Sequence, residues 1–166
     1  YDSRDSRNAP TEGAFGEFIY DVSDSSLGSD VGFQRFRLSL TLLFPLFDAR
    51  FVTVARVAGW LMTGSGIPFY EQTQLGGRTT IRGYGQGRFV ERNAFVANFE
   101  ERVRITEMVI AGNRIEIQLA GFVDVGRVFD EDESFTLDDT KIAAGGALRI
   151  DKAFSWDAPL AAHGMI

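Results

Sequence analysis

Three long segments of the chain alternate apolar and polar residues with a period of two. In 33–44 one face carries Phe36, Leu38, Leu40, Leu42 and Phe44, and the other carries Arg35, Arg37, Ser39 and Thr41. In 94–105 the polar face carries Asn98, Glu100, Arg102 and Arg104, and in 114–125 it carries Arg114, Glu116, Gln118, Phe122 and Asp124. A period of two predicts a β-strand in each segment.

Three further segments complete the predicted strands. Residues 14–22 and 141–150 alternate more softly, while 49–61 is rich in β-branched residues and places Arg50 and Arg56 on one face. The end of another strand is expected before Asn8, and the start of one at 163–166. Glu101 is the one misfit, because it falls on the apolar face of its strand.

The polar faces of these strands indicate what the sheet encloses. A soluble β-sandwich turns its polar face to bulk water, where Lys, Glu and Thr suffice. Here Arg, Asn, Glu, Gln and Asp recur from strand to strand, as in the packed polar lumen of a membrane barrel. The strands are also about 9–12 residues long, enough for a tilted strand to cross a bilayer. We therefore predict an all-β, antiparallel transmembrane β-barrel, with a soluble β-sandwich binding module as the less favoured alternative.

The connections are of unequal length. Tight turns are expected at 44–49 and 105–113, and longer acidic connections at 22–33 and 129–140. Outer-membrane barrels alternate short periplasmic turns with long external loops, so the long connections are assigned to the external side.

Composition narrows the functional classes. The chain has 166 residues, the size of one domain spanning 1–166, and its net charge of −6 argues against nucleic-acid binding. It contains no Cys, which removes disulfide scaffolds, thiolate zinc sites and cysteine nucleophiles. It also contains no apolar run of the ~20 residues that a membrane helix needs, so contact with a lipid bilayer is expected through strands. Because a barrel in lipid must close, six strands suggest either part of a larger barrel or a small barrel whose ends are cut off.

Candidate chemistry is sparse, and we expect no enzyme activity, no cofactor and no metal. His163 is the single histidine, which leaves no basis for a catalytic triad or an imidazole metal site. The acidic run 130–133 with Asp138 and Asp139 lacks the glycine spacing of a calcium loop and is interpreted as a solvated loop. "GGRTTIRGYGQG" lacks the Gly-Lys-Ser/Thr ending of a phosphate loop.

The connection "PFYEQTQLGGRTTIRGYGQG", Pro68 to Gly87, is long and glycine-rich, and it contains Arg82. An arginine in such a loop usually caps solvated backbone, and the loop alone would favour that interpretation. Four motifs in order change it: "DSRNAPTEG" at 5–13, "PFYEQTQLGGRTTIRGY" at 68–84, "ANFEERVRI" at 97–105 and "FVDVG" at 122–126. Together they resemble the barrel domain of the bacterial surface antigen superfamily, which includes BamA-like assembly factors, TamA-like proteins and two-partner-secretion transporters.

The resemblance implies roughly the C-terminal half of such a barrel, located in the bacterial outer membrane. It implies assistance in the insertion, assembly or translocation of outer-membrane proteins, with unfolded clients and periplasmic POTRA or lipoprotein partners. The alternative is a barrel that anchors, or passively transports, a fused passenger such as a patatin-like lipase.

The resemblance also implies a site, here called the loop latch. The loop would fold into the lumen, where Arg82 of the tip Arg82-Gly83-Tyr84 pairs with Glu100 and Asp124 and lies against Phe122. Independently, Glu100, Phe122 and Asp124 all fall on the polar parity of their strands. Gly76, Gly77, Gly83 and Gly85 would allow tight turns close to the wall, and Gly126, which ends the "FVDVG" motif, is counted with these turn glycines.

Overall fold

The computed structural model describes residues 1–7, 9–110, 113–130, 136 and 138–153. Six long strands form the main sheet: β1 (Gly13–Ser23), β2 (Phe33–Leu46), β3 (Phe51–Gly64), β6 (Asn93–Ile110), β7 (Asn113–Phe129) and β8 (Lys141–Ala153). Four short elements lie in the connections: 3₁₀ turns η1 (Ser25–Leu27) and η2 (Phe69–Glu71), and strands β4 (Thr73–Leu75) and β5 (Phe89–Glu91). Within these ranges no helix is long and apolar enough to cross a membrane.

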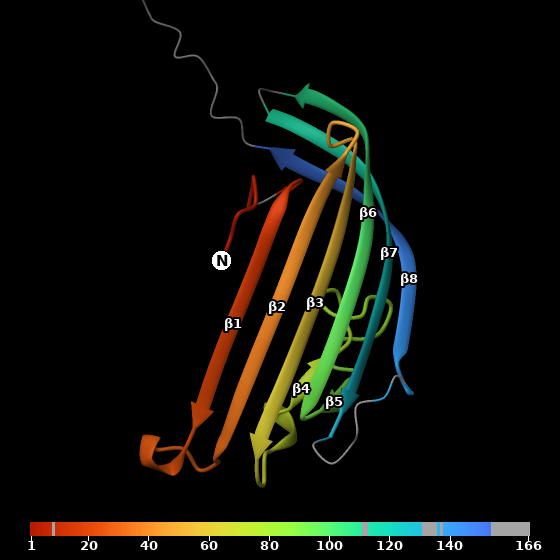
Figure 1. The fold of residues 1–166 in the computed structure, drawn as a ribbon. Coiled ribbons are helices and arrows are strands. Elements are labelled where there is room, and N and C mark those ends of the chain that lie inside the picture. Colours follow the sequence, from red (N-terminus) through yellow and green to blue (C-terminus); the bar gives the residue numbers. More distant parts are fainter. Residues whose placement is uncertain (8, 111–112, 131–135, 137, 154–166) are drawn as a thin grey trace, which may run out of the picture.

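The six strands form an antiparallel meander in the order β1-β2-β3-β6-β7-β8. Figure 1 shows them as a curved sheet that is open at β1 and β8. The predicted all-β antiparallel architecture is confirmed. An open sheet is the arrangement expected for part of a larger barrel. A sandwich of two packed sheets is absent from the described residues, whose second sheet is only the β4–β5 pair.

The strands extend beyond the predicted bounds, and the turn predicted at 105–113 is wrong. β6 continues to Ile110 and pairs with β7 as far as Asn113. A β-bulge shifts the register between Arg104 and Thr106. The extra residue reverses the alternation there, which makes the second half of β6 look unlike a strand in the sequence.

The turn predicted at 44–49 is also shifted. β2 continues to Leu46, and the turn comprises Phe47 to Arg50, so Arg50 lies outside β3. Phe47, Asp48 and Ala49 have φ of 51°, 56° and 57°. Three consecutive left-handed residues without glycine give no sequence signal of a turn, so its position could not be predicted.

The sheet has two chemically different faces. The outer face exposes large apolar side chains, among them Phe18, Leu38, Leu40, Val57, Phe99, Val123 and Leu148. So large an apolar surface is typical of a lipid or protein contact and not of a surface facing water. The misfit Glu101 is accommodated on this face because it accepts a hydrogen bond from Thr53 Oγ1 of the neighbouring strand at 2.6 Å.

The long loop covers the opposite, inner face. β4 contacts β6 and β7 there, and in Figure 1 the loop that contains β4 and β5 lies beside the lower halves of β6 and β7. Leu75 and Ile81 of the loop are fully buried and form a small core with Ala58, Ala94 and Val96 of the wall. Burying such a side chain contributes about 1.5–3 kcal/mol, so this packing holds the loop against the sheet.

The segment before β1 runs back along that strand. Ser3 N donates to Ala14 O at 2.9 Å, and Asp5 N donates to Glu12 O at 3.1 Å. The sequence predicts a strand end before Asn8, but residues 1–7 form only an isolated bridge, Asp2 with Phe15, and no strand. The predicted strand start at 163–166 and His163 lie outside the described residues, as does most of the acidic run 130–133.

Candidate functional site

Register places the polar residues of the inner face in rows that cross the sheet. Arg56 on β3 lies opposite Asn98 on β6, and Asn98 lies opposite Asp124 on β7. One step further along the strands, Glu100 lies opposite Phe122. Directly paired residues in an antiparallel sheet have Cβ atoms about 4.5–5.5 Å apart, so each row presents its side chains as one cluster.

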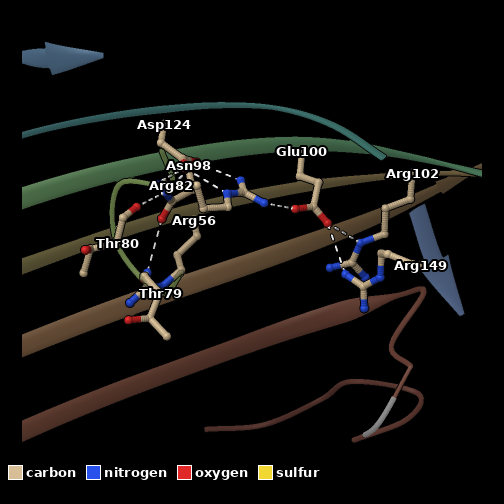
Figure 2. A network of polar contacts seen from close by, with 9 residues as sticks. All are labelled: Arg56, Thr79, Thr80, Arg82, Asn98, Glu100, Arg102, Asp124 and Arg149. Atoms are coloured by element: carbon tan, nitrogen blue, oxygen red, sulfur yellow. Dashed lines mark hydrogen bonds and ion pairs between the residues drawn. The ribbon is translucent and has the colours of Figure 1, made fainter. Parts of the chain in front are cut away.

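Arg82 at the loop tip binds both carboxylates of this cluster (Figure 2). Its Nε donates to Asp124 Oδ2 at 2.8 Å and its Nη2 donates to Asp124 Oδ1 at 2.7 Å, which is a bidentate pair. Its Nη1 donates to Glu100 Oε2. The backbone N of Arg82 also donates to Asp124 Oδ2 at 2.8 Å, so the carboxylate fixes the loop backbone as well as the side chain.

The electrostatic balance of the pair favours the ionised arginine. The Asp124 side chain is 0% exposed, and Arg82 is 24% exposed. The hydrogen bond with Asp124 raises the pKa of Arg82, burial opposes that shift, and the bond with Glu100 adds to it. Removing one partner of such a buried pair typically costs about 3–5 kcal/mol, because the other charge is left uncompensated.

The aromatic ring of Phe122 packs against the guanidinium of Arg82. Arg82 Cζ lies 3.6 Å from the centroid of the Phe122 ring, within the range of a cation–π contact. Gly145 on β8 lies opposite Phe122, and a Cβ at position 145 would come within 2.8 Å of the ring. Gly145 therefore makes room for the ring, a role that the sequence did not reveal.

Two inner-face residues that the sequence did not single out also hold the loop. Asn98 Nδ2 donates to Thr80 O at 2.6 Å and to Asp124 Oδ1 at 2.8 Å. Arg56 Nη1 donates to Thr79 O at 2.7 Å. Both residues lie in the same row as Asp124, so knowledge of the strand register would have indicated them.

Glu100 connects Arg82 to further cations on the inner face. Its Oε1 accepts from Arg102 Nε at 2.7 Å and from Arg149 Nη1 at 3.3 Å (Figure 2). Arg102 Nη1 also donates to Pro10 O at 3.4 Å. One carboxylate therefore links the loop tip, β8 and the turn that precedes β1.

The glycines assigned to the loop have different roles. Gly76, Gly77 and Gly83 have positive φ, and a Cβ at Gly76 would lie 2.2 Å from Gly85 O. Gly85 has no positive φ and has open space around it, so its own backbone does not require glycine. Gly126 is not a turn residue but lies in β7, where a Cβ would come within 2.9 Å of Ile81 Cδ1 and Phe95 O.

Tyr84 follows Gly83 at the tip and packs beside the loop core. Its ring meets that of Phe89 edge-on, with centroids 5.0 Å apart, and its hydroxyl donates to Ile142 O at 3.4 Å. The structure thus brings Arg82, Gly83, Tyr84, Glu100, Phe122 and Asp124 to one region of the inner face. Among the described residues, no acidic or histidine side chains are grouped as a metal site would require.

An antiparallel sheet with an apolar outer face, a charged inner face and a loop fixed to that inner face defines the wall of a membrane β-barrel with a luminal loop. Residues 1–156 match the family model of the Omp85 superfamily domain, and the chain belongs to that superfamily. The resemblance to the barrel of BamA-like and TamA-like proteins is thereby confirmed. Comparison with curated proteins gave no match.

Membership carries general properties of the superfamily. Its members are bacterial outer-membrane proteins that handle outer-membrane protein clients, and they are generally assembly or transport barrels and not enzymes.

Proposed function

We propose that residues 1–166 form one partial barrel domain of an outer-membrane protein that inserts, assembles or translocates other outer-membrane proteins. Superfamily membership supports the class of activity, and the apolar outer face supports contact with the lipid bilayer of the outer membrane. The fully buried Asp124, bound by both the backbone and the side chain of Arg82, is the observation that carries the assignment of the site.

In this proposal the loop latch braces the inner wall. The six tip and wall residues hold the loop, while Gly76, Gly77 and Gly126 allow its close approach. A fixed luminal loop keeps the inner face in one geometry while the outer face meets lipid and client. The activity uses no cofactor, nucleotide or nucleic acid. Unfolded outer-membrane proteins are the proposed clients, with POTRA domains and lipoproteins as periplasmic partners.

The test compares insertion of a client barrel into proteoliposomes by the full-length protein and its variants. Arg82→Ala is expected to abolish insertion and to lower the temperature at which the folded band is lost on gels. Arg82→Lys is expected to be intermediate, because one ammonium cannot reproduce the bidentate pair. Arg88→Ala is the matched control, since Arg88 is an exposed arginine of the same loop that does not bind Glu100 or Asp124.

Wild-type insertion and wild-type thermal behaviour of Arg82→Ala would contradict the proposed role of the latch. If the wild-type barrel is stable in the bilayer but inserts no client, the alternative of an anchor or passive transporter for a fused passenger, such as a patatin-like lipase, takes its place. The same gels address a soluble β-sandwich module, which would show no heat-modifiable migration after detergent extraction.

A further inference from the structure

A cavity of about 220 Å³ lies between the loop and strands β2, β3 and β6 on the inner face. Four arginines line it, Arg56, Arg78, Arg82 and Arg102, together with a single carboxylate, that of Glu100. The chain as a whole carries a net charge of −6, so this concentration of guanidinium groups runs against the overall charge. Such a local excess of one sign within a protein wall attracts counter-ions.

The acidic groups nearby are already engaged. Glu100 Oε1 accepts from Arg102 and Arg149, and its Oε2 accepts from Arg82. Asp124 binds Arg82 and Asn98. Two carboxylates, those of Glu100 and Asp124, therefore face the four arginines of the cavity and Arg149, so positive charge is in excess around it.

Three of the arginines retain unused donors. Arg56 donates only to neutral acceptors, through Nη1 to Thr79 O and Asn98 Oδ1 and through Nε to Ser39 Oγ. Arg102 uses Nε and Nη1. In both residues Nη2 has no partner within the described part of the chain, and the exposed Arg78 makes no hydrogen bond or ion pair there.

We propose that this cavity is a binding site for a phosphate group. A phosphate monoester carries about −1.5 to −2 charge at pH 7 and would offset part of this positive excess. Its several oxygens can accept from three guanidinium groups at once, and the planar fork of arginine binds phosphate in a bidentate manner. The source is either free phosphate or a phosphorylated head group or sugar that reaches the lumen. This site is independent of the proposed client-handling role.

Isothermal titration calorimetry of the full-length protein in detergent tests the site, with inorganic phosphate as the probe and chloride used to hold ionic strength constant. Saturable binding of one phosphate per chain is expected. Arg78→Gln is expected to weaken it about tenfold, as the loss of one charge-assisted contact would. Arg88→Gln removes the same charge from the same loop outside the cavity and is expected to change affinity by no more than about twofold. Glycerol 1-phosphate serves as the second probe, and its binding would indicate a monoester as the source, whereas binding of inorganic phosphate alone would indicate the free anion.

Three results would overturn the proposal: no saturable binding by wild-type protein, an equal loss in Arg78→Gln and Arg88→Gln, or binding of acetate as tight as that of phosphate. The first excludes a site, the second reduces it to overall charge, and the third assigns it to carboxylates. Because no client is present, these results are separate from the outcome of the insertion assay. The shift of the folded band on gels after heating, measured for each variant without phosphate, verifies that the barrel is folded.

Discussion

At the scale of single residues, Asp124 is the centre of the latch. Its carboxylate accepts from the backbone N, Nε and Nη2 of Arg82 and from the side chain of Asn98. A carboxylate that is fully removed from water is stable only if donors such as these compensate its charge, and the guanidinium of Arg82 in turn needs the carboxylate as its counter-charge. The sequence identified Arg82 through its motif, but the fourfold role of Asp124 comes from the geometry.

Asp124→Asn is expected to destabilise the folded sheet by about 3–5 kcal/mol, because the guanidinium of Arg82 would remain without its main counter-charge. The measurement is the temperature at which the folded band disappears on gels. Asp138→Asn makes the same chemical change on an exposed residue and is expected to be neutral within about 0.5 kcal/mol. Equal effects of the two substitutions would contradict the central role of Asp124.

Asp5 gives a pH-dependent contact outside the strands. Its carboxylate accepts from Thr11 Oγ1 at 2.6 Å, from Thr11 N at 2.9 Å and from Glu12 N at 3.2 Å. Burial works against its charge, but these hydrogen bonds lower the pKa of Asp5 below its ordinary value. The stabilisation is therefore complete above the unfolded pKa of about 3.9 and is lost as pH falls through the lower, folded pKa.

We expect the amides of Thr11 and Glu12 to be protected from hydrogen exchange at pH 6 and to lose protection well below pH 4, after correction for the intrinsic exchange rate. The Asp5→Asn variant cannot ionise and should show protection that does not change with pH. Unchanged wild-type protection across this range would contradict a structural role for the Asp5 carboxylate.

At the scale of elements, the loop and β7 fit together through Gly126. Ile81 of the loop core lies over this position, and no space remains for a Cβ. Gly121 lies in the same strand, and a Cβ there would meet nothing within 4 Å. The two glycines therefore form a matched pair within one element.

Gly126→Ala is expected to cost about 1–3 kcal/mol, the usual result of forcing a methyl group into a packed site, and to loosen the loop. Gly121→Ala is expected to be neutral or slightly stabilising, since alanine restricts the unfolded chain. Limited proteolysis at the loop measures the loosening, and the temperature at which the folded band is lost on gels measures the change in stability. A Gly126→Ala variant as stable as Gly121→Ala would show that the loop does not pack on β7 in this way.

Alternation, together with β-branched content at 49–61, predicted all six long strands, and it predicted the two faces of the three most regular ones. It failed where local chemistry departs from the regular pattern, at the bulge beside Ile105 and at the left-handed turn from Phe47 to Ala49. Asn98 and Arg56 were missed as loop contacts for a different reason. Their role depends on which residue of the next strand lies opposite, and that register is set by turns and bulges that the sequence does not reveal.

At the scale of the whole molecule, the two faces of the sheet impose opposite demands on neighbouring positions. Leu40 and Thr41 follow each other in β2, but Leu40 belongs to the exposed apolar face and Thr41 lines the arginine-rich cavity. A charged side chain at Leu40 would face lipid and oppose insertion, whereas a charged side chain at Thr41 would face the arginines of the cavity.

Leu40→Glu is expected to reduce the yield of folded protein in phospholipid vesicles, because a charge on the lipid face opposes insertion. Thr41→Glu is expected to retain the wild-type yield, since the new carboxylate would face Arg56 and Arg102. Protease protection and gel migration after refolding into vesicles report the yield. Equal yields for the two variants would contradict the assignment of the outer face to lipid.

The close approach of Gly83 to β8 offers a reversible chemical tether. A Cβ at position 83 would lie 3.8 Å from that of Ala143, which is the spacing of a disulfide, and the chain has no other cysteine to interfere. With cysteines at both positions, oxidation would fasten the loop tip to the wall and a reductant would release it. If the loop is a static brace, client insertion should be the same in both redox states, with the single Gly83→Cys variant controlling for strain at that residue. Insertion that stops on oxidation and returns on reduction would instead show that the loop must move during client insertion.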